Sequence, residues 1–206
     1  MTAVESESIP MAEPSPDEVR DLAEACIRFV REALGLELDY TPETLPVLDH
    51  YLKERAVTAQ PEVQELIAPA AGAYFGEVVR RCMNGARWYA PAGDYRGQRI
   101  EFDAFFLTFN PTGVAMEVLA DQDAEGWGAH FHVLDEARPA VSASLERTAD
   151  VDTTDYYTLS LRLEVLQQIA DVLMSLESSQ PNPRHFGPDV YRAAEGRNEV
   201  PGALSS

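Results

Sequence analysis

An acidic loop carries the residue types best suited to holding a cation. Asp121, Asp123 and Glu125 alternate along it and Gly126 follows, which is how the oxygen ligands and glycine of a calcium loop begin. The twelfth position, where a glutamate should close such a site, is His132. Because the flanking pattern also predicts strands in place of helices, we interpret the segment as a polar loop, and Asp121 and Asp123 as metal-ligand candidates that we do not favour.

Two histidines, His130 and His132, form a second candidate metal site. One residue separates them in an expected strand, so both imidazoles point to the same face, and such a pair beside a carboxylate can hold a transition metal. In the simplest register with the preceding expected strand, Glu117 lies opposite His132. A cross-strand acid–imidazole pair then explains the histidines without a metal, and we predict no cofactor.

Arginines and aromatic residues gather between residues 80 and 99. Five arginines are interleaved there with Trp88, Tyr89 and Tyr95, and the stretch holds a single acid. In a basic protein this mixture would indicate stacking on single-stranded nucleic acid, but this chain has a net charge of −19 and phosphate would repel it. We expect either ion pairs with neighbouring acids or a patch for an anion or an acidic partner. The residues of that patch are Arg80, Arg81, Arg87, Trp88, Arg96 and Arg99.

The negative charge is concentrated further along the chain. Residues 117–155 hold ten acidic residues and two arginines, a net charge of −8. Such a region is either a solvated rim or a docking surface that speeds association with a basic protein. The candidate partner-binding residues are Glu117, Asp121, Asp123, Glu125, Asp135 and Glu136.

Length and composition indicate one globular domain. The chain has 206 residues, enough for a substantial core but short for two domains. Its hydrophobic fraction of 45% and charged fraction of 25% are ordinary. We find no signal-peptide pattern at the N-terminus and no apolar run near the roughly 18 residues of a membrane span. We therefore expect a cytoplasmic protein that binds neither membranes nor nucleic acids.

Apolar residues at a spacing of 3.6 predict three helices in the first half of the chain. Residues 15–18, Ser-Pro-Asp-Glu, have the order of a capping box, and Gly35 can end the helix that follows. Start signals at residues 41–43 and 60–62 open two more. The last runs to about Met83, and its middle is rich in small residues that let another element pack close.

The spacing then changes to two, which predicts an antiparallel meander. We expect strands at residues 87–90, 99–109, 113–120 and 129–134, with a type I turn at Asn110–Gly113 joining the middle two.

The long strand is apolar on both of its faces. Ile100, Phe102 and Phe106 lie opposite the obvious core side, so either helices cover them or they form an interface. We expect burial beneath helices.

A short helix through residues 141–145 and a long one from about residue 154 to residue 176 follow. Beyond them, residues 179–206 have the composition of a mostly irregular tail, in which Phe186 and Tyr191 are possible anchors.

Together these elements predict an α+β fold. Three N-terminal helices and the long C-terminal helix should pack on an antiparallel β-meander of three to five strands. The single domain spans residues 15–178, between a disordered acidic tail at residues 1–14 and the tail at 179–206.

Three segments carry a resemblance to known sequences: residues 36–45, residues 72–81 (Gly-Ala-Tyr-Phe-Gly-Glu-Val-Val-Arg-Arg) and Trp88. They are similar to a loose set of uncharacterised bacterial cytosolic proteins over about residues 30–90. The resemblance implies a bacterial source and supplies no activity or catalytic residue.

No motif of a known enzyme class is present. The sequence contains no GxSxG, P-loop, GxGxxG or HExxH pattern. We therefore hypothesise a non-enzymatic, acidic protein-binding domain, such as an inhibitor or immunity-type protein that holds a basic effector. The alternatives are a small-molecule or metal-dependent enzyme with its site near the Asp121–His132 end of the sheet, and a structural or regulatory subunit of an assembly.

Overall fold

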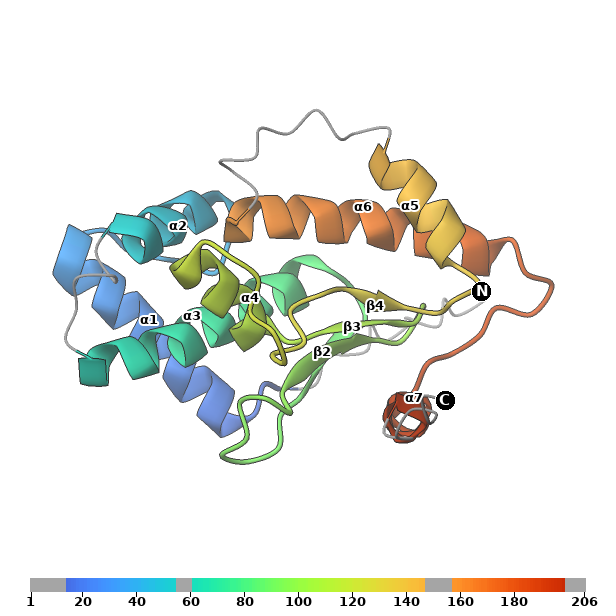
Figure 1. Cartoon of the computed structure of the whole chain (residues 1–206), viewed down its shortest axis with the longest axis horizontal. Coiled ribbons are helices and arrows are strands. Elements are labelled where there is room, and N and C mark those ends of the chain that lie inside the picture. Colours follow the sequence, from blue (N-terminus) through green and yellow to red (C-terminus); the bar gives the residue numbers. More distant parts are fainter. Residues whose placement is uncertain (1–13, 55–60, 147–156, 199–206) are drawn as a thin grey trace, which may run out of the picture.

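The computed structural model describes residues 14–54, 61–146 and 157–198, apart from the side chains of residues 61–65 and 195–198. Within these ranges seven α-helices and a four-stranded antiparallel sheet form an α+β fold, which confirms the predicted class (Figure 1). The predicted tail at residues 1–14 lies, except for its last residue, outside the described residues.

The three predicted N-terminal helices are present. They are α1 (Asp17–Leu34), α2 (Leu45–Glu54, preceded by a 3-10 turn at Pro42–Thr44) and α3 (Pro61–Cys82). Gly35 ends α1 in the left-handed conformation, at φ +69°, as its lack of a Cβ allows.

The predicted capping box at residues 15–18 is wrong. Pro16, which has no side-chain acceptor, occupies the N-cap position of α1. Ser15 instead donates its hydroxyl to Glu77 Oε1, 2.5 Å away on α3. The Ser15 side chain, which the local pattern predicts as the cap of α1, therefore binds Glu77 on another helix.

The small residues in the middle of α3 allow the close packing that we predicted. A Cβ placed on Gly72 would lie 2.5 Å from Thr112 Cα, and one on Gly76 would lie 2.2 Å from the Trp88 ring. Helix α4 (Pro111–Ala120) and strand β1 (Ala86–Tyr89) can approach α3 this closely only because both positions are glycine.

The sheet is a meander in the order β1-β2-β3-β4: β1 (Ala86–Tyr89), β2 (Arg99–Phe102), β3 (Leu107–Phe109) and β4 (His132–Val133). The single strand predicted for residues 99–109 is thus wrong, because a turn at residues 103–106 divides it into a hairpin.

The strand predicted for residues 113–120 is also wrong, since Pro111–Ala120 forms helix α4. Asn110 is its N-cap and accepts a hydrogen bond from Gly113 N at 3.1 Å. Asparagine followed by proline opens a helix as readily as a type I turn. Because α4 is buried on most sides, its apolar residues show no clear period that would distinguish the two.

The second half of the chain adds three helices, α5 (Arg138–Glu146), α6 (Leu159–Ser178) and α7 (Pro188–Asn198). The first two match the predicted short and long helices. Helix α7 lies in the tail that we predicted to be mostly irregular, and the predicted anchors Phe186 and Tyr191 are both buried.

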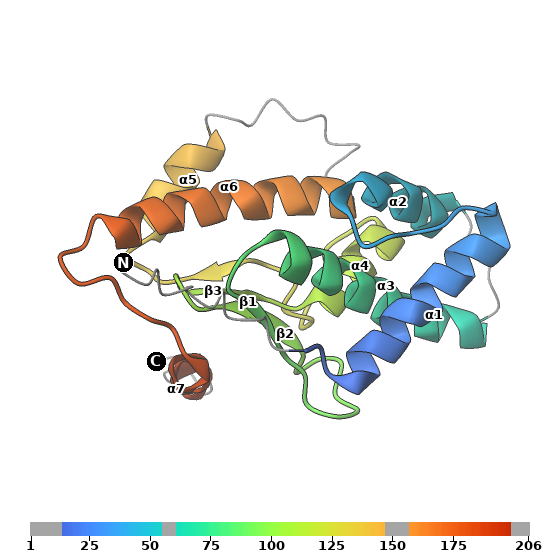
Figure 2. The same cartoon turned by 180° about the vertical axis from the view of Figure 1, so that it is seen from behind.

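Helices cover both faces of the sheet. In both views α6 and α7 lie on opposite sides of the strands (Figure 1, Figure 2). Ile100 pairs with Phe109 and Leu107 with Val133, so these residues share the inner face, towards the main core. The predicted burial of Ile100, Phe102 and Phe106 is confirmed, but Phe106 packs in a separate cluster with Phe186 and Tyr191.

The turn at residues 103–106 also changes which residues form the outer face. Glu101 pairs with Thr108, and Thr108 with His132, so these side chains and that of Arg99 lie opposite the main core. No described helix is long and apolar enough to span a membrane.

Candidate functional site

The acidic loop follows helix α4 and leads to strand β4. Asp121 ends α4 with φ +51°, in the left-handed region. Glu117 on the last turn of the helix holds the loop, because its main-chain oxygen accepts from Gln122 N (3.3 Å) and its Oε1 accepts from Ala124 N (3.4 Å). The Tyr157 hydroxyl donates to Asp123 Oδ1 at 3.0 Å. The loop therefore has a fixed base.

Glu117 does not face His132, so the predicted acid–imidazole pair is wrong. Thr108 lies opposite His132, because residues 113–120 are helical. The Glu117 carboxylate instead accepts from Arg162 Nη2 on α6, at 2.5 Å. Both side chains are buried, which removes Glu117 from any docking surface.

Five of the six predicted partner-binding acids are exposed. Asp121, Asp123 and Glu125 lie at the surface of the loop, and none of them makes an ion pair with a residue that the structure describes. Asp135 pairs with Arg138 at 3.0 Å and Glu136 with Arg184 at 2.7 Å.

The predicted arginine patch divides into two centres, each built on a buried glutamate. The first is Glu77 on α3, with 4% of its side chain exposed. Its carboxylate binds Arg80 Nε (2.9 Å), Trp88 Nε1 (2.8 Å) and, at the rim, Arg81 Nε (3.5 Å). Burial raises the pKa of the Glu77 carboxyl, but hydrogen bonds from Arg80, Ser15 and Trp88 outweigh it and leave that pKa below its ordinary value.

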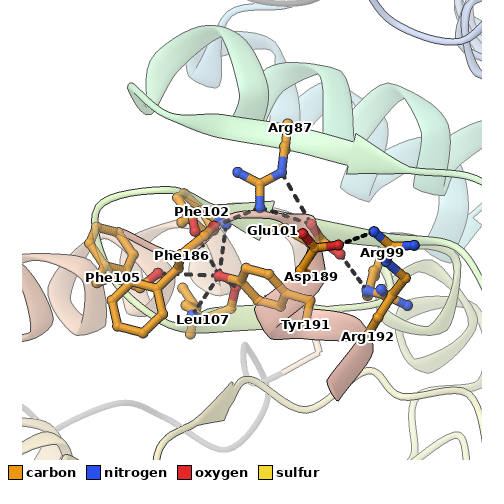
Figure 3. Close-up of polar contacts among 10 residues, drawn as sticks. All are labelled: Arg87, Arg99, Glu101, Phe102, Phe105, Leu107, Phe186, Asp189, Tyr191 and Arg192. Carbon is orange, nitrogen blue, oxygen red and sulfur yellow. Dashed lines mark hydrogen bonds and ion pairs between the residues drawn. The ribbon is translucent and has the colours of Figure 1, made fainter. Parts of the chain in front are cut away.

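The second centre is Glu101 on β2, with 1% of its side chain exposed (Figure 3). Arg99 Nε donates to its Oε1 at 2.8 Å and Arg87 Nε to its Oε2 at 3.1 Å. Arg87 also donates to Phe186 O at 2.7 Å. Two guanidinium groups therefore share one buried carboxylate.

Tyr191 attaches helix α7 beside the Glu101 centre. Its hydroxyl donates to Phe102 O at 2.7 Å and accepts from Phe102 N at 3.1 Å and Leu107 N at 3.3 Å (Figure 3). These main-chain groups flank the turn that divides the predicted long strand. The tyrosine thus replaces the ladder bonds that a continuous strand would have used.

A pocket of about 460 Å³ opens beside this centre on the outer face of the sheet. Arg99, Thr108 and His132 line it from the strands, and Tyr191 and Ala194 from α7. The other polar and apolar lining residues come from the segments on either side: Arg96, Gly97, Gln98, Phe106, Phe109, Asn110, Gly128, Val133, Leu134, Asp135 and Arg138.

The acidic loop and this pocket are neighbours. The Arg96 guanidinium lies 4.6 Å from the centre of the Trp127 ring, which follows the loop acids, and Gly128 O accepts from Asn110 N at 2.8 Å. Two surfaces of opposite charge therefore meet at this end of the sheet.

The histidines have a different setting from the one predicted. His132 is an exposed residue whose ring is partly desolvated, and this partial desolvation, followed by the proximity of His130 and Arg138, lowers its pKa. Among the described residues no group of three His, Cys, Asp or Glu side chains is placed to hold a metal ion.

Four residues of this site were not identified from the sequence: Gln98, Glu101, Thr108 and Tyr191. Of these, Tyr191 was predicted only as an anchor of the C-terminal tail. Their neighbours in sequence carry no motif, and the pocket forms only when β2, β3 and α7 meet. The available signal was the alternation Arg99-Ile100-Glu101-Phe102, which puts two charges on one face of an otherwise apolar strand.

Comparisons with known proteins support the predicted resemblance. No curated protein and no solved structure matches the chain. The stretch from residue 2 to residue 98, which contains helices α1 to α3 and strand β1, matches the model of a family of unknown function (DUF6278), so this part of the chain is similar to that uncharacterised family.

Proposed function

We propose that this chain is a non-enzymatic binding domain and that a basic protein docks on its acidic loop. The observation that carries the proposal is the state of Asp121, Asp123 and Glu125: three exposed carboxylates without an ion pair to a described residue, on a loop with a fixed base. Because the main chain at the base of the loop is already fixed, the loop loses little freedom when its carboxylates meet a partner's lysines or arginines.

The net charge of −19 supports the same proposal. A charge of this size speeds the approach of a basic protein and repels nucleic acid and anionic membranes. An inhibitor or immunity-type protein that holds a basic effector in a bacterial cytoplasm is the most concrete form of the proposal.

A variant with neutral loop residues, D121N/D123N/E125Q, tests it. Tagged wild-type protein and the variant are each incubated with lysate of the source cell, and captured proteins are identified at low and high salt. We expect a captured protein of high isoelectric point, whose association with the variant is about tenfold slower at low salt.

A control variant with the same change in net charge makes the test specific to the loop. D21N/E32Q/D171N neutralises three exposed acids on α1 and α6, and we expect it to retain most of the partner's association rate. Equal loss in both variants, or binding that does not depend on salt, would contradict docking on the loop.

One observation favours a second candidate function, the binding of a small molecule at the same end of the sheet. The pocket lined by Arg99, Thr108 and His132 has a volume within the usual range of ligand sites. The possibility of a structural or regulatory subunit remains a prediction.

A further inference from the structure

Two buried hydrogen-bonding groups in the pocket have no partner among the described residues. They are Gln98 Nε2, on a side chain of a residue that is 2% exposed, and Thr108 Oγ1. Buried polar groups nearly always have a partner, and an exception in a native fold calls for an explanation. Both residues line the same pocket, so a single molecule in the pocket could supply acceptors to both.

The charges around these two groups are mainly positive. Three arginines, Arg96, Arg99 and Arg138, line the pocket together with one carboxylate, Asp135. Beneath them Glu101 is already shared by two arginines. In a chain of net charge −19, this is a local reversal of sign, and it favours a ligand that carries negative charge.

The remaining walls are apolar. Phe106 and Tyr191, stacked with ring centres 4.6 Å apart, form one side of the pocket, and Leu134 lines it from the residue after β4. A volume of about 460 Å³ is much larger than an inorganic anion needs and is suited to a small organic molecule.

We propose that this pocket binds a small organic anion: its carboxylate or phosphate oxygens accept from Gln98, Thr108 and the arginines, and its apolar part lies against Phe106 and Tyr191. The proposal is independent of the basic protein partner. It also explains why two buried polar groups are retained at a cost to stability, because natural proteins accept such a cost mainly at functional sites.

Four probes test the proposal on the full chain: benzoate, phenyl phosphate, benzamide and inorganic phosphate. Isothermal titration calorimetry and NMR chemical shifts follow binding up to millimolar concentrations. We expect saturable binding of benzoate or phenyl phosphate, and the tighter of the two identifies the anionic group. Benzamide has the shape of benzoate without its charge, and inorganic phosphate lacks the apolar part, so both should bind at least about tenfold more weakly.

Substitutions locate the site and separate binding from folding. Gln98→Leu and Thr108→Val remove the two buried polar groups with little change in shape. We expect each to weaken binding of the better probe about tenfold while the melting temperature of the free protein stays the same or rises. A residue with a purely structural role would give the opposite result, a lower melting temperature.

Charge variants complete the test. Arg138→Gln in the pocket should weaken binding of the better probe several-fold, whereas Arg28→Gln, at an exposed position of α1, should not change it. The proposal is overturned if neither anion saturates, if benzamide binds as tightly as benzoate, or if inorganic phosphate binds as tightly as phenyl phosphate. Unchanged binding in both Gln98→Leu and Thr108→Val would also overturn it.

Discussion

Glu77 and Glu101 each bind two of the five arginines of residues 80–99, and they differ in what surrounds the carboxylate. Glu77 accepts from Ser15 and Trp88 as well as from its arginines, and Arg81 reaches it from the surface with 46% of its side chain exposed. Glu101 accepts from Arg87 and Arg99 on a face of the sheet that helix α7 only partly covers.

The difference is one of access. At Glu77 the carboxylate accepts from Ser15, Arg80 and Trp88, so this centre ties α3 to β1 and to the start of α1. At Glu101 one of the two arginines, Arg99, lines a pocket that also contains Gln98 and Thr108. An arginine-rich stretch therefore yields one structural centre and one that is suited to binding.

The largest expected effect is on stability, from Glu101→Gln compared with Glu77→Gln. Glu101→Gln leaves Arg87 and Arg99 close together without the carboxylate between them, and breaking a buried ion pair costs about 3–5 kcal/mol. Glu77→Gln should cost less, about 1–3 kcal/mol, because Arg81 is 46% exposed and water can solvate it when the carboxylate is lost. Urea unfolding of both variants measures the difference, and equal losses would contradict the proposed contrast.

The next largest effect concerns helix α7, which forms one wall of the pocket beside the Glu101 centre. Tyr191→Phe removes the hydroxyl that bonds the main chain of Phe102 and Leu107, and we expect a loss of about 1–3 kcal/mol in the free energy of unfolding. Hydrogen exchange at these two amides should also become faster. Tyr95→Phe, at a half-buried position away from the β2–β3 turn, is the control. A loss no greater than that of Tyr95→Phe would show that the hydroxyl does not attach α7.

A pH titration of protein stability examines the Glu77 centre. The pKa of Glu77 in the folded protein lies below its ordinary value of 4.5. The folded state therefore favours the ionised form, and the resulting stabilisation is complete above pH 4.5 and is lost as the pH falls through the lower folded pKa. The stability difference between wild type and Glu77→Gln should shrink over that acid range. Glu32→Gln, on the exposed side of α1, controls for the loss of one carboxylate, and a constant difference for Glu77→Gln would contradict the assignment.

Helices with a clear apolar period could be predicted from the sequence, and elements that depend on distant contacts could not. The periods of α1 and α6 appear in the residues themselves. The turn at residues 103–106 is hydrogen-bonded by the Tyr191 hydroxyl, which lies 86 positions after Phe105 and 89 after Phe102, and no local pattern contains this contact. Residues 111–120 form helix α4 and not the predicted strand, and the sequence does not distinguish the two because a buried helix has no polar face to reveal its period.

The candidate site was only partly predictable for the same reason. Arg87, Arg96 and Arg99 stand out as charges in an aromatic stretch, whereas Gln98 and Thr108 are ordinary residues whose significance is their burial without a partner. Glu117 shows the opposite case. Composition predicts it as part of the acidic surface, but it is buried against Arg162. Composition locates charge along the chain, but only the fold decides which charges remain available.

The smallest expected effect concerns the pKa of His132, which lines the pocket beside the Glu101 centre. Partial desolvation of the ring and the proximity of His130 and Arg138 lower its pKa below the ordinary value of 6.5, so the ring is neutral at pH 7. Arg99 and Asp135 line the same pocket, and Glu101 lies on the same face of the sheet beyond Thr108. In the free protein this histidine stabilises the fold above pH 6.5, and that contribution is lost as the pH falls through the folded pKa.

A bound anion should raise the pKa of His132, because negative charge nearby favours the imidazolium. By linkage, binding of the better probe should then tighten as the pH falls below the ordinary histidine value, by at most about tenfold, and should level off below the pKa of the free state. NMR titration of the His132 ring with and without the probe measures this, with His50 on α2 as the control that should not respond. A pKa of His132 that stays the same or falls at saturation would show that the anion does not lie beside this ring.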